Sequence, residues 1–117
     1  MDKRAIKRAY KEARPPMGVY RVHNRVADRS LVGSSTNVAA MLNRHRAQLK
    51  MGLHANRALQ QDWAQFGEEG FAFEVLDTLT PGEEPGFDAA SELQTLEELW
   101  LERLAPYGAR GYNAQPR

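Results

Sequence analysis

The chain has 117 residues and no cysteine, so we expect one domain, and disulfide bridges and thiolate zinc sites are excluded. Hydrophobic residues make up 42% of the chain and charged residues 26%, which is typical of a soluble globular protein. No apolar run is long enough to span a membrane, and the basic N-terminus lacks the apolar segment of a secretory signal. We therefore expect a cytoplasmic protein.

The net charge of +1 conceals a strong asymmetry between the two halves of the chain. Residues 1–57 hold thirteen of the sixteen lysines and arginines and carry a net charge of +10. Residues 58–117 hold twelve of the fifteen acidic residues and carry a net charge of −9. This division indicates that one face meets a polyanion. The alternative is that the two halves neutralise each other across the fold.

The N-terminal segment predicts a basic helix over residues 3–13, because Ile6 and Tyr10 lie four apart on one side and cations occupy the rest. The prolines in "RPP" end this helix. We interpret residues 1–16 as a basic helical extension, with a plain capping helix as the alternative. The cations of the helix at 3–13 are Lys3, Arg4, Lys7, Arg8 and Lys11.

Residues 17–23 and 30–33 predict two strands joined by a short polar loop, and therefore an antiparallel hairpin. The two-residue period places Tyr20 and Val22 on one face and Val19 and Arg21 on the other. A turn centred near residues 25–26 would set Tyr20 opposite Leu31.

The remaining elements are two helices, a strand and a last helix. The first helix starts at Thr36 or Asn37 and ends before Gly52, with an inner stripe of Val38, Met41, Leu42, His45 and Leu49. We expect a helix at about 55–66, a strand at 71–79 and a helix at about 89–105, followed by an irregular tail. Asp88 is a candidate cap of the last helix, and Ser91 and Gln94 have the spacing of a capping box. The order predicts an α+β fold, a small three-stranded antiparallel sheet flanked by helices.

Glu97 occupies an unusual place on the last helix. It lies four residues after Leu93 and three before Trp100, and hence on the apolar stripe. A carboxylate that faces a core costs several kcal/mol unless it is paired, hydrogen-bonded or bound to metal. One interpretation is a glutamate at the rim of the core or paired with an arginine, and the other is a single-carboxylate ligand of a divalent cation.

Two short motifs on the hairpin, "GVY" at 18–20 and "LVG" at 31–33, are followed in order by "GSS", "NRHRAQL", "GLHANRALQQDW", "FAFEVLD", "LEELW" and "GYN". This ordered set resembles the GIY-YIG nuclease family, and most of all the nuclease domain of its phage homing endonucleases. The resemblance covers about residues 17–113, so residues 17–117 are interpreted as a GIY-YIG-like domain. It implies cleavage of DNA phosphodiesters with one divalent metal ion.

The resemblance also implies roles for individual residues. Tyr20 matches a tyrosine that helps activate the attacking water, and Glu97 matches the metal-binding glutamate, in agreement with its place on the helix. His45 and His54 match histidines that often line the site. The supporting positions are Gly18, Gly33 and Asn113.

Two positions depart from the family pattern. The second motif normally opens with tyrosine, and here that residue is Leu31. The family's catalytic arginine lies eight residues past the second-motif glycine, and here that residue is Met41. Arg44 lies one helical turn further on and could replace it as a phosphate clamp, while Arg46 is less well aimed. The alternative for Arg44 is an ordinary surface arginine.

The sequence therefore predicts a DNA-binding protein with weak or altered endonuclease activity that depends on Mg²⁺ or Mn²⁺, with Tyr20, Arg44, His45, His54 and Glu97 as candidate catalytic residues. Binding would be mostly to the phosphate backbone, through the N-terminal cations together with Arg46, Lys50 and Arg57, with little sequence specificity. One alternative is an inactive DNA-binding module of DNA processing, repair or uptake. Another is a protein-interaction adaptor, which only the acidic half supports.

Overall fold

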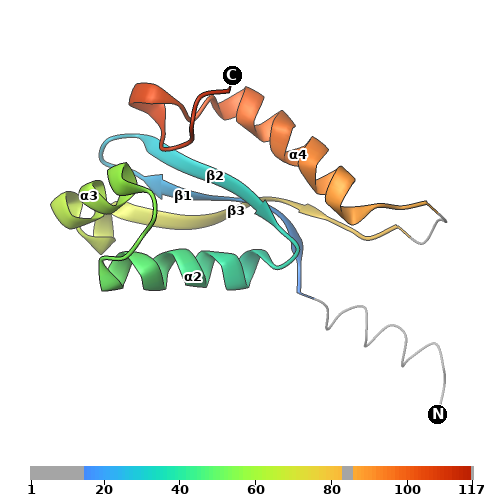
Figure 1. Cartoon of the computed structure of the whole chain (residues 1–117), viewed down its shortest axis with the longest axis horizontal. Helices are drawn as coiled ribbons and strands as arrows, with labels where there is room; N and C mark the ends of the chain where they lie inside the picture. Colours follow the sequence, from blue (N-terminus) through green and yellow to red (C-terminus); the bar gives the residue numbers. More distant parts are fainter. Residues whose placement is uncertain (1–14, 83–85, 117) are drawn as a thin grey trace, which may run out of the picture.

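The computed structural model describes residues 15–82 and 86–116, which form one three-stranded antiparallel sheet with helices on both faces (Figure 1). The predicted helix at 3–13, and with it the proposed extension over residues 1–16, falls almost entirely outside the described residues. The strands are β1 (Met17–Asn24), β2 (Arg29–Ser35) and β3 (Phe71–Leu79), in the order β2-β1-β3. The predicted α+β class is confirmed.

The helices α2 (Val38–Met51) and α4 (Ala89–Leu104) lie on opposite sides of the sheet, and α3 (Arg57–Phe66) lies near the hairpin turn (Figure 1). Two short 3-10 helices, η1 (Glu68–Gly70) and η2 (Gly108–Arg110), precede β3 and follow α4. Across the described residues, no helix combines the length and the apolar composition that a membrane span requires.

Helix boundaries follow from side-chain caps. The side chains of Asn37, Asn56 and Asp88 each accept a hydrogen bond from a backbone N–H in the first turn of α2, α3 and α4. Gly52 ends α2 in the left-handed region at φ 73°, where glycine carries no steric penalty. The predicted capping box at Ser91 and Gln94 is wrong, because Asp88 already starts the helix three residues earlier.

The centre of the hairpin turn lies one residue further along the sequence than predicted, so the pairing of β1 with β2 differs from the prediction. Tyr20 pairs with Gly33, and Leu31 pairs with Val22 instead of Tyr20. The Asn24 side chain causes this, because its Oδ1 accepts hydrogen bonds from the N–H groups of Val26 and Ala27, at 3.0 and 3.1 Å. The turn therefore spans residues 25–28, and each residue of β1 pairs with a β2 residue two positions later than predicted.

The central strand β1 also approaches β3 very closely at Gly18. A Cβ atom at this position would lie 2.0 Å from the carbonyl oxygen of Asp77, so only glycine fits. A bulge follows at once, because Val19 pairs with Asp77 and Tyr20 with Val75, which leaves Leu76 unpaired.

The main core lies between the Tyr20 face of the sheet and helices α2 and α3. The predicted inner stripe of α2 is confirmed: Val38, Leu42 and Leu49 are buried, and Met41 and His45 are half-buried. The other buried members of this core are Tyr20, Val22, Leu59, Trp63, Phe71 and Tyr112.

The C-terminal tail is more ordered than the sequence predicted. Gly111 forms a parallel bridge with Ser30, and the Asn113 amide both donates to the Val32 carbonyl, at 2.8 Å, and accepts from the Val32 N–H, at 2.9 Å. These contacts satisfy the outer edge of β2, which would otherwise expose unpaired backbone groups.

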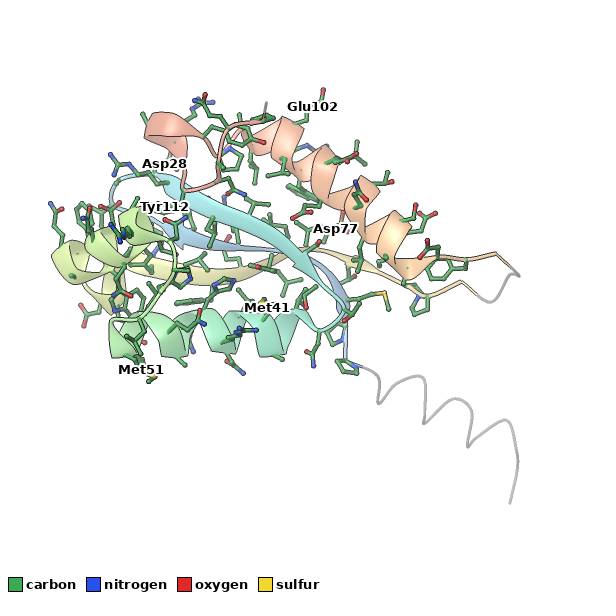
Figure 2. All side chains as sticks on the ribbon, in the orientation of Figure 1. Asp28, Met41, Met51, Asp77, Glu102 and Tyr112 are labelled. Atoms are coloured by element: carbon green, nitrogen blue, oxygen red, sulfur yellow. The ribbon has the colours of Figure 1, made fainter. Side chains whose placement is uncertain are left out.

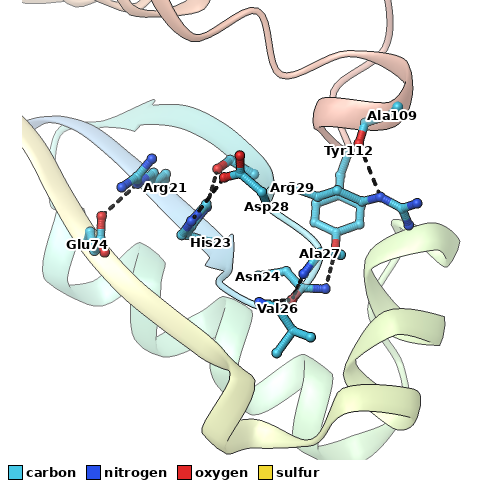
Figure 3. A network of polar contacts seen from close by, with 11 residues as sticks. Arg21, His23, Asn24, Val26, Ala27, Asp28, Arg29, Glu74, Ala109 and Tyr112 are labelled. Atoms are coloured by element: carbon cyan, nitrogen blue, oxygen red, sulfur yellow. Dashed lines mark hydrogen bonds and ion pairs between the residues drawn. The ribbon is translucent and has the colours of Figure 1, made fainter.

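A buried polar network joins this tail to the hairpin turn (Figure 3). The Tyr112 hydroxyl donates to Asp62 Oδ2 at 2.7 Å and accepts from Asn24 Nδ2 at 3.2 Å. Arg29 pairs with the same Asp62 oxygen at 3.0 Å. One hydroxyl thus connects the turn, α3 and the tail.

We expect Tyr112→Phe to destabilise the fold by about 1–3 kcal/mol, because Asp62 and Asn24 would each lose a buried hydrogen-bond partner. Urea denaturation measures the loss as a change in the free energy of unfolding. Tyr107→Phe is the matched control, since the Tyr107 hydroxyl makes no hydrogen bond within the described part of the chain. Equal stability of the two variants would contradict this role for the network.

Candidate active site

Three side chains form a continuous hydrogen-bond chain beneath the sheet. The Tyr20 hydroxyl lies 2.9 Å from His45 Nε2, and His45 Nδ1 lies 2.8 Å from His54 Nε2. Tyr20 belongs to β1, His45 to α2, and His54 to the loop between α2 and α3. The predicted cluster of tyrosine and two histidines therefore exists as a connected unit.

The Tyr20 ring can occupy its position because Gly33 has no side chain. A Cβ atom at Gly33 would lie 2.5 Å from the Tyr20 hydroxyl oxygen and 2.7 Å from the ring carbon that bears it. Since Tyr20 and Gly33 are cross-strand partners, the ring lies across β2 and reaches toward its edge. Any larger residue at Gly33 would displace the phenol from His45.

The contact of His54 with the backbone of Asn56 determines which group donates in each of these hydrogen bonds. The backbone N–H of Asn56 donates to His54 Nδ1 at 3.0 Å, so this nitrogen is an acceptor, and a neutral His54 carries its proton on Nε2. His54 therefore donates to His45 Nδ1, and His45 Nε2 donates to the Tyr20 oxygen. The hydrogen of the Tyr20 hydroxyl is then available to a group other than the two histidines.

Both histidines are neutral at pH 7. Burial, followed by the nearby His54 and Arg44, lowers the pKa of His45 to about 4. Burial also lowers the pKa of His54. In contrast, burial and the negative charge of Glu97 raise the pKa of Tyr20 to about 12, so the phenol keeps its proton. The charge of Glu97 therefore reaches the Tyr20 hydroxyl.

An open cleft of about 620 Å³ lies where β2 leads into α2 and faces the first half of α4. Glu97, half-buried, lines it together with Met41 from α2; Figure 2 labels Met41 on the side of α2 that faces the sheet. Trp100 helps to hold α4 in this orientation by donating to Asp77 Oδ2 on β3 at 3.1 Å. The other lining residues are Ser34, Ser35, Thr36, Ala90, Leu93 and Gln94.

The predicted cations lie away from this cleft. Arg44 is exposed and is not among the cleft residues, although its charge reaches His45. Arg46 places its guanidinium 4.4 Å from the centre of the Phe73 ring, and Lys50 pairs with Glu68 at 3.4 Å. Arg57 is exposed at the start of α3. The catalytic and DNA-binding roles of these cations remain predictions.

Two contributors were missed by the sequence analysis. The backbone N–H of Asn56 selects the tautomer of His54, and Gln60 Oε1 accepts a hydrogen bond from the His54 backbone N–H at 3.0 Å. Asn56 could have been recognised as a helix cap, but its contact with a histidine two residues earlier depends on the loop conformation. The supporting positions Gly18, Gly33 and Asn113 all act on the backbone around Tyr20.

The cleft offers hard oxygen ligands for one divalent cation. Within residues 15–82 and 86–116, no group of three or more His, Cys, Asp or Glu side chains could form a metal cage. Glu97 is the one carboxylate among the described residues that line the cleft, beside hydroxyl groups and an amide. This donor set fits Mg²⁺ or Mn²⁺, which are commonly held by one or two carboxylates, with water and phosphate oxygens as the other ligands.

Comparison with solved structures decides the fold. The catalytic domain of homing endonuclease I-TevI is 22% identical, with a TM-score of 0.69 over 86% of this chain and 99% of that domain. A mutant of the catalytic domain of intron endonuclease I-TevI is 21% identical, with a TM-score of 0.67 over 84% and 92%. The chain has the GIY-YIG fold. No family model and no curated protein matches it.

Within this GIY-YIG-like fold, the two departures noted in the sequence have defined environments. Leu31 is half-buried and packs against the main core. Met41, at the position where the resemblance implies an arginine, lines the cleft. The cleft is therefore lined by a carboxylate, hydroxyls, an amide and apolar groups, with no cation among the described residues that form it.

The low pKa of His45 gives the fold a pH-dependent stability. Because the folded-state pKa of about 4 lies below the ordinary value of 6.5, the unfolded chain takes up the proton first as the pH falls. We expect the free energy of unfolding to decrease between pH 6.5 and 4, and to decrease less in His45→Gln. Urea denaturation across this range measures both. An NMR titration in which the His45 ring protonates near pH 6.5 would contradict the assignment.

Proposed function

We propose that the protein binds DNA and cleaves its phosphodiester bonds weakly, with Mg²⁺ or Mn²⁺ as cofactor. One observation carries this proposal: Glu97 lines an open cleft, and its charge acts on the phenol of Tyr20, which ends the histidine chain. A half-buried carboxylate in an open cleft, whose charge reaches an oriented hydroxyl, is a suitable arrangement for hydrolysis of a bound phosphate diester. The GIY-YIG fold, shared with endonuclease domains, adds to the case.

In this proposal each side chain has a separate task. Glu97 holds the cation, which when bound stabilises negative charge on the phosphate and makes water more acidic. Tyr20 is protonated at neutral pH, so it orients the attacking water through hydrogen bonds instead of removing a proton as a phenolate. His45 and His54 keep the Tyr20 hydroxyl in place.

Weak activity is expected because no cation is among the described residues that line the cleft. Loss of one positioned donor to the developing negative charge typically costs about 10²–10³-fold in rate. Met41 supplies no donor, and Arg44, three residues further along α2, is exposed outside the cleft.

DNA is proposed to approach from the α2 and α3 side. Arg44, Arg46, Lys50 and Arg57 are exposed there, and such side chains bind backbone phosphates independently of sequence. Helix α4 on the other side of the sheet carries exposed Glu92, Glu98 and Glu102, and these carboxylates disfavour a DNA duplex along its exposed face.

An inactive DNA-binding module is the second candidate, and the methionine in the cleft favours it. Phosphate contacts by surface cations require neither Tyr20 nor Glu97. The two candidates differ in one result: binding without metal-dependent cleavage supports the module.

Glu97→Gln is expected to reduce nicking of supercoiled plasmid in Mg²⁺ or Mn²⁺ at least 100-fold, because the substitution removes the proposed metal-binding charge and keeps the shape. Agarose-gel assays of initial rates measure it. Glu98→Gln is the matched control, since Glu98 is the adjacent residue and is exposed outside the cleft. If Glu97→Gln and wild type nick at the same rate, cleavage does not come from this cleft.

Met41→Arg is expected to raise metal-dependent nicking at least tenfold, because it returns a guanidinium to the cleft. Ala47→Arg, at an exposed position of the same helix, adds the same charge away from the cleft and should change the rate little. A rate that stays at the wild-type level in Met41→Arg would show that charge at this position is not what limits the reaction.

A further inference from the structure

A second concavity lies at the other end of α4, outside the proposed active site. It has a volume of about 220 Å³ and is formed by β1, the hairpin turn, the end of α4 and η2. Three arginines line it, Arg21, Arg103 and Arg110, beside Asp28 and Ser30. Neither the histidine chain nor the cleft uses any of these residues.

The three guanidinium groups come from three different elements. Arg21 lies on the face of β1 opposite Tyr20, and its Nε pairs with Glu74 Oε2 at 2.6 Å (Figure 3). This contact leaves the two terminal nitrogens of Arg21 for another partner. Arg103 is in the last turn of α4 and stacks on Trp100 at 5.0 Å, and Arg110 ends η2.

The pocket keeps an excess of positive charge. Across residues 15–82 and 86–116, neither Arg103 nor Arg110 forms an ion pair with a carboxylate. Asp28 is the one carboxylate in the described lining; its side chain is 91% exposed and lies 3.5 Å from His23 (Figure 3). Glu74 offsets the charge of Arg21. Arg103 and Arg110 outweigh Asp28 together with the about half a negative charge that the C-terminal end of α4 adds. The balance favours an anion.

Arginine is the side chain best suited to phosphate, because its planar fork donates two parallel hydrogen bonds to two oxygens. A phosphate monoester carries a charge of about −1.5 to −2 at pH 7, and its oxygens can accept hydrogen bonds from more than one guanidinium group. A volume of about 220 Å³ accommodates such a group with bound water. Longer apolar ligands have little to contact, since Leu104 and Pro106 are the only apolar side chains in the described lining.

We propose that this arginine pocket binds a phosphate dianion, either as free phosphate or as the terminal phosphate of a nucleic acid strand. The pocket and the cleft contact opposite ends of α4 and of β2: Glu97 lines the cleft and Leu104 the pocket, about 10 Å apart along the helix. The proposal does not depend on cleavage in the cleft, and it holds for an inactive protein as well.

Titration of the whole chain with inorganic phosphate tests the pocket. By calorimetry at 150 mM NaCl, we expect saturable binding to wild type and binding at least tenfold weaker in Arg103→Gln and Arg110→Gln. Arg25→Gln is the matched control, because Arg25 donates to the Glu69 carbonyl instead of lining the pocket. Equal binding by all four proteins, or no binding by wild type, would overturn the assignment.

Two oligonucleotides, one with a 5′-phosphate and one with a 5′-hydroxyl, then identify the source of the phosphate. Tighter binding of the phosphorylated strand that is lost in Arg110→Gln supports a strand terminus as the ligand. Phosphate binding without this preference supports a free anion. NMR amide shifts at Ser30 and Gly111 on phosphate addition locate the ligand in both cases, and shifts confined to α2 and α3 would contradict the proposal.

Discussion

The Tyr20 ring lies across Gly33, and the hydrogen bond between its hydroxyl and His45 depends on that close approach. The absence of a side chain at Gly33 allows the phenol to reach the edge of β2. From there its oxygen accepts from His45, whose other nitrogen accepts from His54. The histidines are buried and neutral, so this chain orients the hydroxyl without adding charge to the site.

The same strands that position Tyr20 are held by the end of the chain. Asn113 pairs with both backbone groups of Val32, the neighbour of Gly33, and Tyr112 joins the hairpin turn to α3 through Asp62. The tail thus stabilises β2 at the point where the phenol crosses it. Loss of these contacts would expose the edge of β2 and disturb the position of the Tyr20 ring that crosses it.

Exposed charges of opposite sign lie on the two sides of the sheet. The α2 and α3 side carries exposed cations, α4 carries exposed carboxylates, and Glu97 is the α4 carboxylate that reaches the cleft. Met41 leaves the described lining of that cleft without a cation, whereas three arginines gather in the pocket at the far end of α4. Among the lining residues that the structure describes, positive charge is therefore found in the pocket and not in the cleft.

Periodicity and capping chemistry determined most of the fold, because they are local properties. The strand at 71–79, a helix start at Thr36 or Asn37, the Asp88 cap, the Gly52 stop and the place of Glu97 on the inner stripe of its helix were predicted from spacings of a few residues, and the ordered motifs predicted the GIY-YIG fold. The hairpin register was not predicted, because the Asn24 side chain, and not the length of the loop, positions the turn. Tertiary structure alone decided the order of the tail, the tautomer of His54 and the meeting of Arg21, Arg103 and Arg110. Each of these depends on groups that are distant in sequence or on a loop conformation, and no local pattern encodes such contacts.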